Sequence, residues 1–410
     1  MKPFLEHFNT FCDTRTPSTQ EGTDSILSLI YSDIRASYRY IDSIYKSKKL
    51  AKSVGNICCV DDIPKTHLLH NKLIPLDVKL HIKNMAVGYF KVKVCVWNIN
   101  ANIYFLMFNK SEFNNLKLIE KKIRQILIIL SFCSLYMKTA LIKHINLFLY
   151  LTNIDKKIPK NFLAVLGNKH CNSVITLICP EKVELLIFRN EEWQKVLINE
   201  LFRCMCLDFS GLDYCQLKKD VKMLFNVEST FEISRSYTEF WATIINSCMI
   251  SYNLLDKKED KESFLLYSEF CIQFEKIFSL FQCVKILHYM GLKYSNLYKN
   301  DDVSISLRKL LYKENTHIFA YYIIKVILLL NHDRYLQWCL INNSNLIAFD
   351  KSPLTFKKFG EFIKIHYNSS NFINKIEKVE ALFYKLQVRY IRSEKNAIIK
   401  TSRMTICEID

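Results

Sequence analysis

The chain has 410 residues, of which 50% are hydrophobic and 13% aromatic, so its composition excludes an intrinsically disordered protein. Only seven Gly and seven Pro occur, which disfavours a β-sandwich and favours a helix-rich globular protein of roughly two or three domains. The formal net charge of +17 suits an acidic partner such as nucleic acid, unless the lysines only keep an apolar chain in solution.

The cysteines and the apolar runs of the sequence indicate the cellular compartment in which the protein is expected. Fifteen cysteines are scattered without a CxxC pair or zinc-finger spacing, and the odd count predicts reduced thiols in a cytosol-like compartment. The first thirteen residues hold acids and a His but no apolar core, so we expect no signal peptide. The longest apolar runs, 126–137 and 319–330, are too short to span a bilayer, so no membrane span is predicted.

Residues 1–75 are predicted to form a helical, partly irregular N-terminal region. Apolar positions recur at helical spacing from Ile26 to Ile41, and the run KSKKLAKS (46–53) follows as a basic linker or helix end. Residues 80–108 contain two β-prone runs joined at NINAN (98–102), which predicts a hairpin. Further along, a helix is expected over 115–143, strands over 145–154, 173–179 and 182–190, and a helix over 191–206.

From about residue 215 onward the sequence is predicted to be helical almost throughout. The fold class is therefore α+β, helix-rich, with a small central mixed sheet and an all-helical C-terminal region. We expect an N-terminal region over 1–75, an α+β domain over 76–255, and a helical region over 256–410 that ends in an exposed basic tail, RYIRSEKNAIIKTSR (389–403). The expected C-terminal helices are 215–225, 236–255, 261–290, 303–313, 315–331, 333–342, 354–366 and 370–392.

The segment EEWQKVLINELFRCMCLDFSG (191–211) carries the candidate site. On a helical wheel the segment is apolar over most of its circumference, which predicts that the helix is buried. A carboxylate on such a helix needs a partner. Arg203 lies three positions after Glu200 and is therefore within reach of it.

Glu200 also stands at the glutamate of the H-E-x-x-H pattern of zinc peptidases, with Asn199 and Arg203 in place of the two histidines. In that pattern, two histidines one helical turn apart hold one zinc ion, and the Glu acts on the metal-bound water. Asn is a poor zinc ligand, and the Arg guanidinium carries a fixed positive charge without a lone pair. These positions cannot form a normal zinc site, so we expect no zinc cofactor.

The flanking sequences carry a family resemblance. The blocks INLFLYLTNIDKKIP, LGNKHCNSVIT, VELLIFRNEEWQKVLINELFRCMCLDFSG and SYTEFWATIIN follow one another over about 145–250, roughly a quarter of the chain. In order and spacing they resemble the metallopeptidase-like (H-E-x-x-H, gluzincin-type) protein family of the large nucleocytoplasmic DNA viruses. The matching positions are Leu166, Gly167, His170, Asn172, Phe188, Arg189, Glu191, Glu192, Trp193, Lys195, Val196, Ile198, Glu200, Phe202, Leu207, Asp208, Phe209, Ser210, Glu239, Trp241 and Ala242.

The resemblance implies a metallopeptidase-like sheet and a gluzincin-like site, with two His from one helix and a Glu from the next. Glu239 matches the third-ligand position and Glu200 the general base. Because both histidines are replaced, we expect a vestigial site in which Arg203 supplies the positive charge of the zinc and pairs with Glu200 and Glu239. His170 and Asn172 match other family positions, and His170 either contacts a substrate or is a hydrogen-bonded loop residue.

The predicted function is that of a catalytically degenerate viral protein that acts as a binding or scaffold factor in the host cytoplasm or the virion. One alternative is a basic nucleic-acid-binding or transcription-related factor, and another is an active zinc metallopeptidase with an atypical site, such as Glu200, Glu239 and His170. Protein partners cannot be named from the sequence. Basic clusters suggest nucleic acid, unless they are solvated helix ends, although no recognition motif accompanies them. The clusters are Lys46, Lys48, Lys49 and Lys52; Lys121, Lys122 and Arg124; Lys156, Lys157 and Lys160; Lys218, Lys219 and Lys222; and Arg389, Arg392, Lys395, Lys400 and Arg403.

Overall fold

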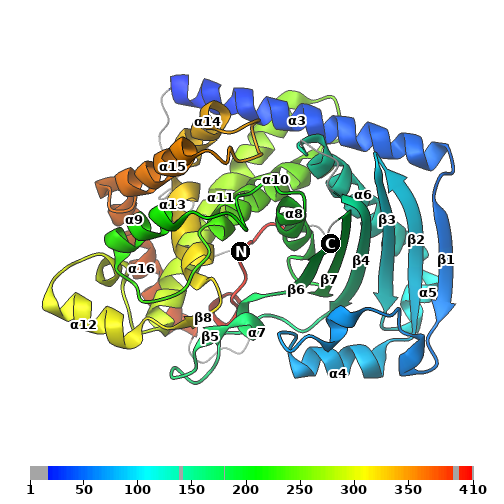
Figure 1. The fold of residues 1–410 in the computed structure, drawn as a ribbon, viewed down its shortest axis with the longest axis horizontal. Coiled ribbons are helices and arrows are strands. Elements are labelled where there is room, and N and C mark those ends of the chain that lie inside the picture. The colour runs from blue at the N-terminus through cyan, green and yellow to red at the C-terminus, as the bar shows by residue number, and fades with distance from the viewer. Residues whose placement is uncertain (1–16, 138–141, 180, 391–396, 409–410) are drawn as a thin grey trace. The chain divides into compact units, whose positions relative to one another are not determined.

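The structure is a computed structural model that describes residues 17–137, 142–179, 181–390 and 397–408 (Figure 1). These residues form two compact units. The sheet unit comprises Leu29–Asp155 and Asn172–Leu207, and the helical unit comprises the described residues of Met1–Ser28, Lys156–Cys171 and Asp208–Asp410. The units interleave along the chain and so differ from the three consecutive regions expected from the sequence.

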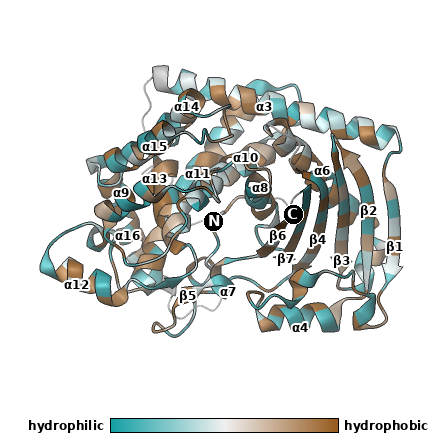
Figure 2. Ribbon diagram, viewed as in Figure 1, coloured by the Kyte–Doolittle hydropathy of each residue, from teal (hydrophilic) through white to brown (hydrophobic). Residues whose placement is uncertain are grey.

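The sheet unit is built on a six-stranded mixed sheet of order β1-β2-β3-β4-β7-β6. The β3–β4 and β4–β7 pairs are parallel, and the other pairs are antiparallel. In Figure 2 the central strands β4 and β7 are mostly hydrophobic, and most of their residues are buried. The strands are β1 (Ala51–Asn56), β2 (Gly88–Val96), β3 (Ile99–Met107), β4 (Ile142–Thr152), β6 (Val174–Cys179) and β7 (Glu181–Arg189).

Helices cover both faces of this sheet. On one face lie α6 (Leu116–Leu135) and α8 (Trp193–Cys204), which pack on each other and on β2 and β7. On the other face, α4 (Leu76–Met85) and the 3-10 turn η2 (His67–His70) bury a cluster that includes Val78, Ile82, Phe148 and Leu186. Burial of each such side chain stabilises the fold by about 1.5–3 kcal/mol. The 3-10 turn η1 (Val60–Asp62) and the short helix α5 (Lys110–Asn114) also belong to the unit.

The helical unit is built around α10 (Ser234–Leu254) and α11 (Lys261–Tyr289), whose residues are mostly buried. A two-residue parallel pair joins β5 (Leu166–Gly167) to β8 (Glu314–Asn315), and α7 (Asn168–Cys171) follows β5. The other elements are α9 (Cys215–Phe225), η3 (Tyr294–Leu297), α12 (Asp302–Leu311), the π-helical turn η4 (Phe319–Ile324), α13 (Lys325–Leu330), α14 (His332–Asn342), α15 (Pro353–His366), α16 (Ser370–Tyr390) and α17 (Ala397–Lys400).

The predicted α+β class, with its mixed sheet and its helical C-terminal region, is confirmed. Helix α3 (Pro17–Lys46) forms in the predicted N-terminal region, and its residues from Leu29 onward belong to the sheet unit. No helix within the described ranges combines the length and the apolar character needed to cross a membrane.

Three local predictions are corrected by the structure. The run KSKKLAKS (46–53) does contain a helix end, since α3 ends at Lys46, but it is not a linker throughout, because its last three residues begin β1. The β1 sequence AKSVGN has little β propensity and is held by backbone pairing with β2. The predicted hairpin forms, but β3 begins at Ile99, so the turn lies at Trp97 and Asn98. The helix expected over 115–143 ends at Leu135, and Ile142 already begins β4.

Candidate functional site

The candidate site lies on α8, which directly follows β7 in the sheet unit. The chain turns into the helix at Glu192, whose backbone adopts a left-handed conformation with φ of 60°. Every residue of α8 except Arg203 is buried, because the helix packs against α6, β6 and β7. The predicted burial is confirmed, and each polar side chain on this helix therefore needs a partner inside the protein.

Glu200 lies in this buried layer, and Arg203 and Thr176 are among its polar partners. Its side chain is only 6% exposed, and its Oε2 atom forms an ion pair with Nη1 of Arg203. The hydroxyl of Thr176, on β6, donates a hydrogen bond to the same oxygen at 2.7 Å. The predicted pairing of Glu200 with Arg203 is thus observed, in the i,i+3 geometry that one turn of helix provides.

The other positions of the predicted site fall in both units. Asn199 is buried on α8, and Asn172 lies in the loop before β6, both in the sheet unit. Glu239 is buried on α10 of the helical unit. Because Glu239 belongs to a different unit from Arg203, the expected pairing of these two residues stays a prediction.

His170 lies in α7 of the helical unit, where it is buried. Its Nδ1 atom accepts a hydrogen bond from the backbone N–H of Gly167 at 3.1 Å, and its backbone carbonyl accepts one from the Ser402 hydroxyl. The side-chain contact is a hydrogen bond of the kind that one alternative predicted, and contact of His170 with a substrate stays a prediction. The two hydrogen bonds fix the turn between β5 and α7.

A metal ion needs several ligand side chains close together. Within the ranges that the structure describes, no group of three or more His, Cys, Asp or Glu residues is arranged to hold a metal ion. Glu200 faces Arg203 and Thr176, which are not metal ligands of a zinc peptidase.

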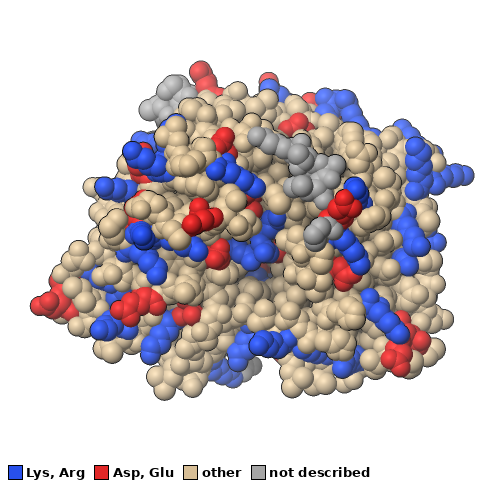
Figure 3. Space-filling view, viewed as in Figure 1, with Lys and Arg blue, Asp and Glu red and all other residues tan. Residues whose placement is uncertain are grey.

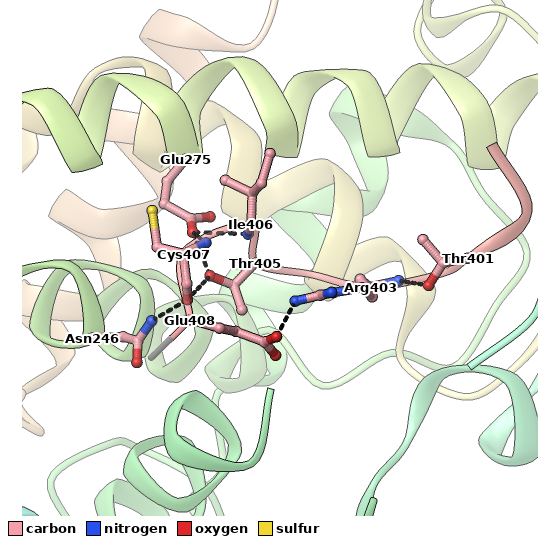
Figure 4. Close-up of polar contacts among 8 residues, drawn as sticks. All are labelled: Asn246, Glu275, Thr401, Arg403, Thr405, Ile406, Cys407 and Glu408. Atoms are coloured by element: carbon pink, nitrogen blue, oxygen red, sulfur yellow. Dashed lines mark hydrogen bonds and ion pairs between the residues drawn. The ribbon is translucent and has the colours of Figure 1, made fainter. Parts of the chain in front are cut away.

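A second concentration of buried charge lies in the helical unit and was not predicted (Figure 4). Glu275, on α11, is fully buried, and its Oε1 atom accepts hydrogen bonds from the Thr405 hydroxyl and from two backbone N–H groups. Those N–H groups belong to Ile406 and Cys407, at 2.9 and 2.8 Å. Asn246 of α10 donates to the carbonyl of Cys407 at 3.0 Å, so both sides of this backbone are held.

Two buried lysines hold the preceding part of the same segment. Lys285 of α11 donates to the carbonyl groups of Ile398 and Thr401 at 2.6 and 2.5 Å, and Lys325 of α13 donates to that of Met404 at 2.8 Å. Burial holds the pKa of the Lys285 amine well below its usual range. Charged groups of the helices thus bind the backbone of residues 398–407, which we call the C-terminal segment.

The C-terminal segment overlaps the end of the predicted exposed basic tail (389–403). There the prediction is right for Lys400, which is exposed, and wrong for Thr401 and Ser402, which are buried. Ser402 and Thr405 are fully buried, and Arg403 forms an ion pair with Glu408 at 2.7 Å. Arg392 and Lys395 of the predicted tail lie outside the described residues. One sequence signal pointed to this arrangement, since Lys285 and Lys325 interrupt long apolar runs, and a lysine there requires carbonyl or carboxylate partners.

A third carboxylate, that of the half-buried Glu314 of β8, also has neutral donors around it. The Ser229 hydroxyl donates to its Oε1 atom at 2.7 Å, and the Phe319 backbone N–H donates to Oε2 at 3.0 Å. Burial nevertheless raises the pKa of Glu314 to about 7, because its desolvation outweighs these hydrogen bonds.

No protein-family model, curated protein or solved structure matches this chain. The metallopeptidase-like resemblance therefore rests on the sequence blocks over 145–250 and stays a prediction.

Proposed function

We propose that this chain is a catalytically degenerate, metallopeptidase-like protein of a large nucleocytoplasmic DNA virus, and that it works by binding partners and not by hydrolysis. The observation that supports the proposal is the ion pair of Glu200 with Arg203, at the helix position where the resembling peptidases carry zinc ligands. An arginine at a ligand position repels a metal cation and offers no lone pair to it.

The surroundings of Glu200 also disfavour its use as a general base. A general base must reach the proton that it abstracts, directly or through one water molecule. The Glu200 side chain is 6% exposed, and its Oε2 atom already accepts hydrogen bonds from Arg203 and Thr176. We therefore assign to this pair the structural task of joining α8 to β6.

An active peptidase with an atypical site is the less favoured alternative. Such a site would have to gather Glu200, Glu239 and His170 around one metal ion. The Nδ1 atom of His170 already accepts the Gly167 N–H, and the Glu200 carboxylate faces a guanidinium. Both groups would have to exchange these partners before they could bind zinc.

The proposed binding role fits the host cytoplasm or the virion as the place of action. The cysteines that the structure describes are free thiols, as expected in a reducing compartment. The proposed partners are a viral protein or nucleic acid, for which a net charge of +17 is favourable.

The test is elemental analysis of protein purified after expression in zinc-supplemented medium, combined with a peptidase assay. We expect substoichiometric zinc and the same background hydrolysis for the wild type and Glu200→Gln. Arg203→His alone should not bind zinc, because Asn199 remains, whereas adding Asn199→His should raise zinc content. One zinc per wild-type chain, with hydrolysis that Glu200→Gln abolishes, would overturn the proposal.

A further inference from the structure

The sheet unit brings together two basic clusters that are distant in the sequence. Asp42 of α3 pairs with Arg124 of α6, and Lys52 of β1 pairs with Glu120 of α6 at 2.6 Å, across 68 residues of chain. The end of α3 and the start of β1 therefore lie beside the first half of α6. We call this surface the basic corner, and define it as Lys46, Lys48, Lys49, Lys52, Lys117, Lys121 and Arg124.

The basic corner carries a clear excess of positive charge. Its seven Lys and Arg residues face two carboxylates, those of Asp42 and Glu120. Within the described residues, Lys46, Lys48, Lys49 and Lys117 are exposed and form no ion pair. Figure 3 shows Lys and Arg gathered where α3 ends in Figure 1. The ranges of the sheet unit contain 23 Lys and Arg against 13 Asp and Glu, a charge of +10.

An exposed aromatic ring packs against α3, the helix that ends at Lys46. Trp97, in the β2–β3 turn, is 46% exposed and stacks on Tyr40 of α3, with ring centroids 4.2 Å apart and planes 9° from parallel. Lys46 follows Tyr40 by six positions, about 9 Å along the helix axis. The Trp97 Nε1–H donates to Ser131 of α6 at 3.1 Å, which fixes the ring and engages its donor. The surface that Trp97 offers to a ligand is therefore its π system.

Fixed aromatic surface beside lysines is the combination that binds single-stranded nucleic acid. Lysines neutralise phosphates and release counterions, and unpaired bases stack on an aromatic ring without regard to sequence. Bases within a duplex are already stacked and leave no face for Trp97. We propose that the basic corner and Trp97 bind single-stranded nucleic acid, with lysines on the phosphates and Trp97 against one base. This inference is independent of the proposed loss of peptidase activity.

The test measures fluorescence anisotropy of a labelled 20-nucleotide oligothymidine with the full-length protein over a range of salt concentrations. The variant Lys46→Glu/Lys48→Glu/Lys49→Glu should weaken binding at least tenfold and make the salt dependence shallower by about two, since each phosphate contact contributes about 0.7 to the slope. The matched control is Lys65→Glu/Lys72→Glu/Lys83→Glu, three exposed lysines of the same unit outside the basic corner, which changes net charge equally. This control should bind within about twofold of the wild type.

The role of Trp97 has its own measurement. Trp97→Ala should weaken oligothymidine binding about tenfold with an unchanged salt slope, and Trp97→Phe should retain most of the affinity, because a ring remains for stacking. If both triple-lysine variants lose the same affinity for oligothymidine, net charge alone explains the binding, and the proposed site is wrong. A duplex bound as tightly as the single strand would overturn the stacking role. Binding to phosphatidylserine vesicles without binding to oligothymidine would assign the surface to membranes instead.

Discussion

Two buried carboxylates of this chain, Glu200 and Glu275, are stabilised in opposite ways. Glu200 pairs with a full positive charge three residues further along its own helix. Glu275 accepts hydrogen bonds from neutral groups that lie 130 to 132 residues away in the sequence. The first arrangement is available as soon as α8 forms, whereas the second exists only when the C-terminal segment has docked.

The comparison shows that a charge without a local partner makes a fold depend on a distant segment. Lys285 and Lys325 share this dependence with Glu275, because each donates to backbone carbonyls of the C-terminal segment. A buried charge left unpaired costs several kcal/mol, which is comparable to a substantial part of a domain's total stability. The C-terminal segment is therefore an integral part of the helical unit.

Removal of the C-terminal segment should lower the free energy of unfolding more than any other change proposed below. A chain that ends before residue 397 would leave Glu275, Lys285 and Lys325 without their backbone partners, at a cost of more than about 5 kcal/mol. Urea denaturation followed by circular dichroism measures the loss, and a chain that ends at Glu408 is the matched control, since it keeps the described contacts. A truncated chain as stable as this control would show that the segment only covers the surface.

The substitution Glu275→Leu tests this comparison, because it should destabilise the full chain but stabilise the chain that lacks the C-terminal segment. In the full chain, this substitution removes the acceptor of the Thr405, Ile406 and Cys407 groups and should cost about 4 kcal/mol. In the truncated chain it removes an unpaired buried carboxylate and should be stabilising. A double-mutant cycle in urea gives both values. Equal destabilisation in the two backgrounds would mean that the cost arises from packing alone.

The pH dependence of the free energy of unfolding tests Glu314, a carboxylate that is bound by neutral donors. Its folded-state pKa of about 7 lies above the unfolded value near 4.5, so the native state binds more protons between these values. The free energy of unfolding should therefore fall as pH rises from about 4.5 to 7, by on the order of 3 kcal/mol from this residue.

The difference between wild type and Glu314→Gln isolates this effect, because the amide cannot ionise. Burial lowers the pKa of His332 and His366, which gives stability the opposite slope in the same pH range, but both chains share that contribution. Denaturation curves at several pH values should show the variant gaining relative to the wild type as pH rises. Parallel curves would contradict the raised pKa.

Changes to the ion pair of Glu200 with Arg203 should alter the free energy of unfolding least. Arg203→Met removes the ion pair of the buried Glu200 carboxylate, which keeps its hydrogen bond from Thr176. The Arg203 side chain is 19% exposed, so water can approach, and the cost should be about 2 kcal/mol. Glu200→Gln combined with Arg203→Met removes both charges and should lie within about 1 kcal/mol of the wild type. Urea denaturation measures both variants. A double variant less stable than Arg203→Met would show that the pair itself contributes net stability.

The sequence determined those features that depend on neighbours a few residues apart. Helical periodicity located α9 at Cys215–Phe225 and α11 within a residue of its ends, because apolar spacing reports which face of a helix is buried. The same local geometry predicted the burial of α8 and the pairing of Glu200 with Arg203.

Tertiary structure alone decided the features that depend on distant partners. The polar run of β1 forms a strand because β2 supplies its hydrogen bonds, and the lysines around residue 48 join those around 120 because α3 lies along α6. The C-terminal segment has the composition of an exposed tail, yet most of residues 401–405 are buried because Glu275, Lys285 and Lys325 bind the backbone of the segment. Backbone N–H and C=O groups are the same in every residue, so a sequence pattern does not show which side chains will bind them.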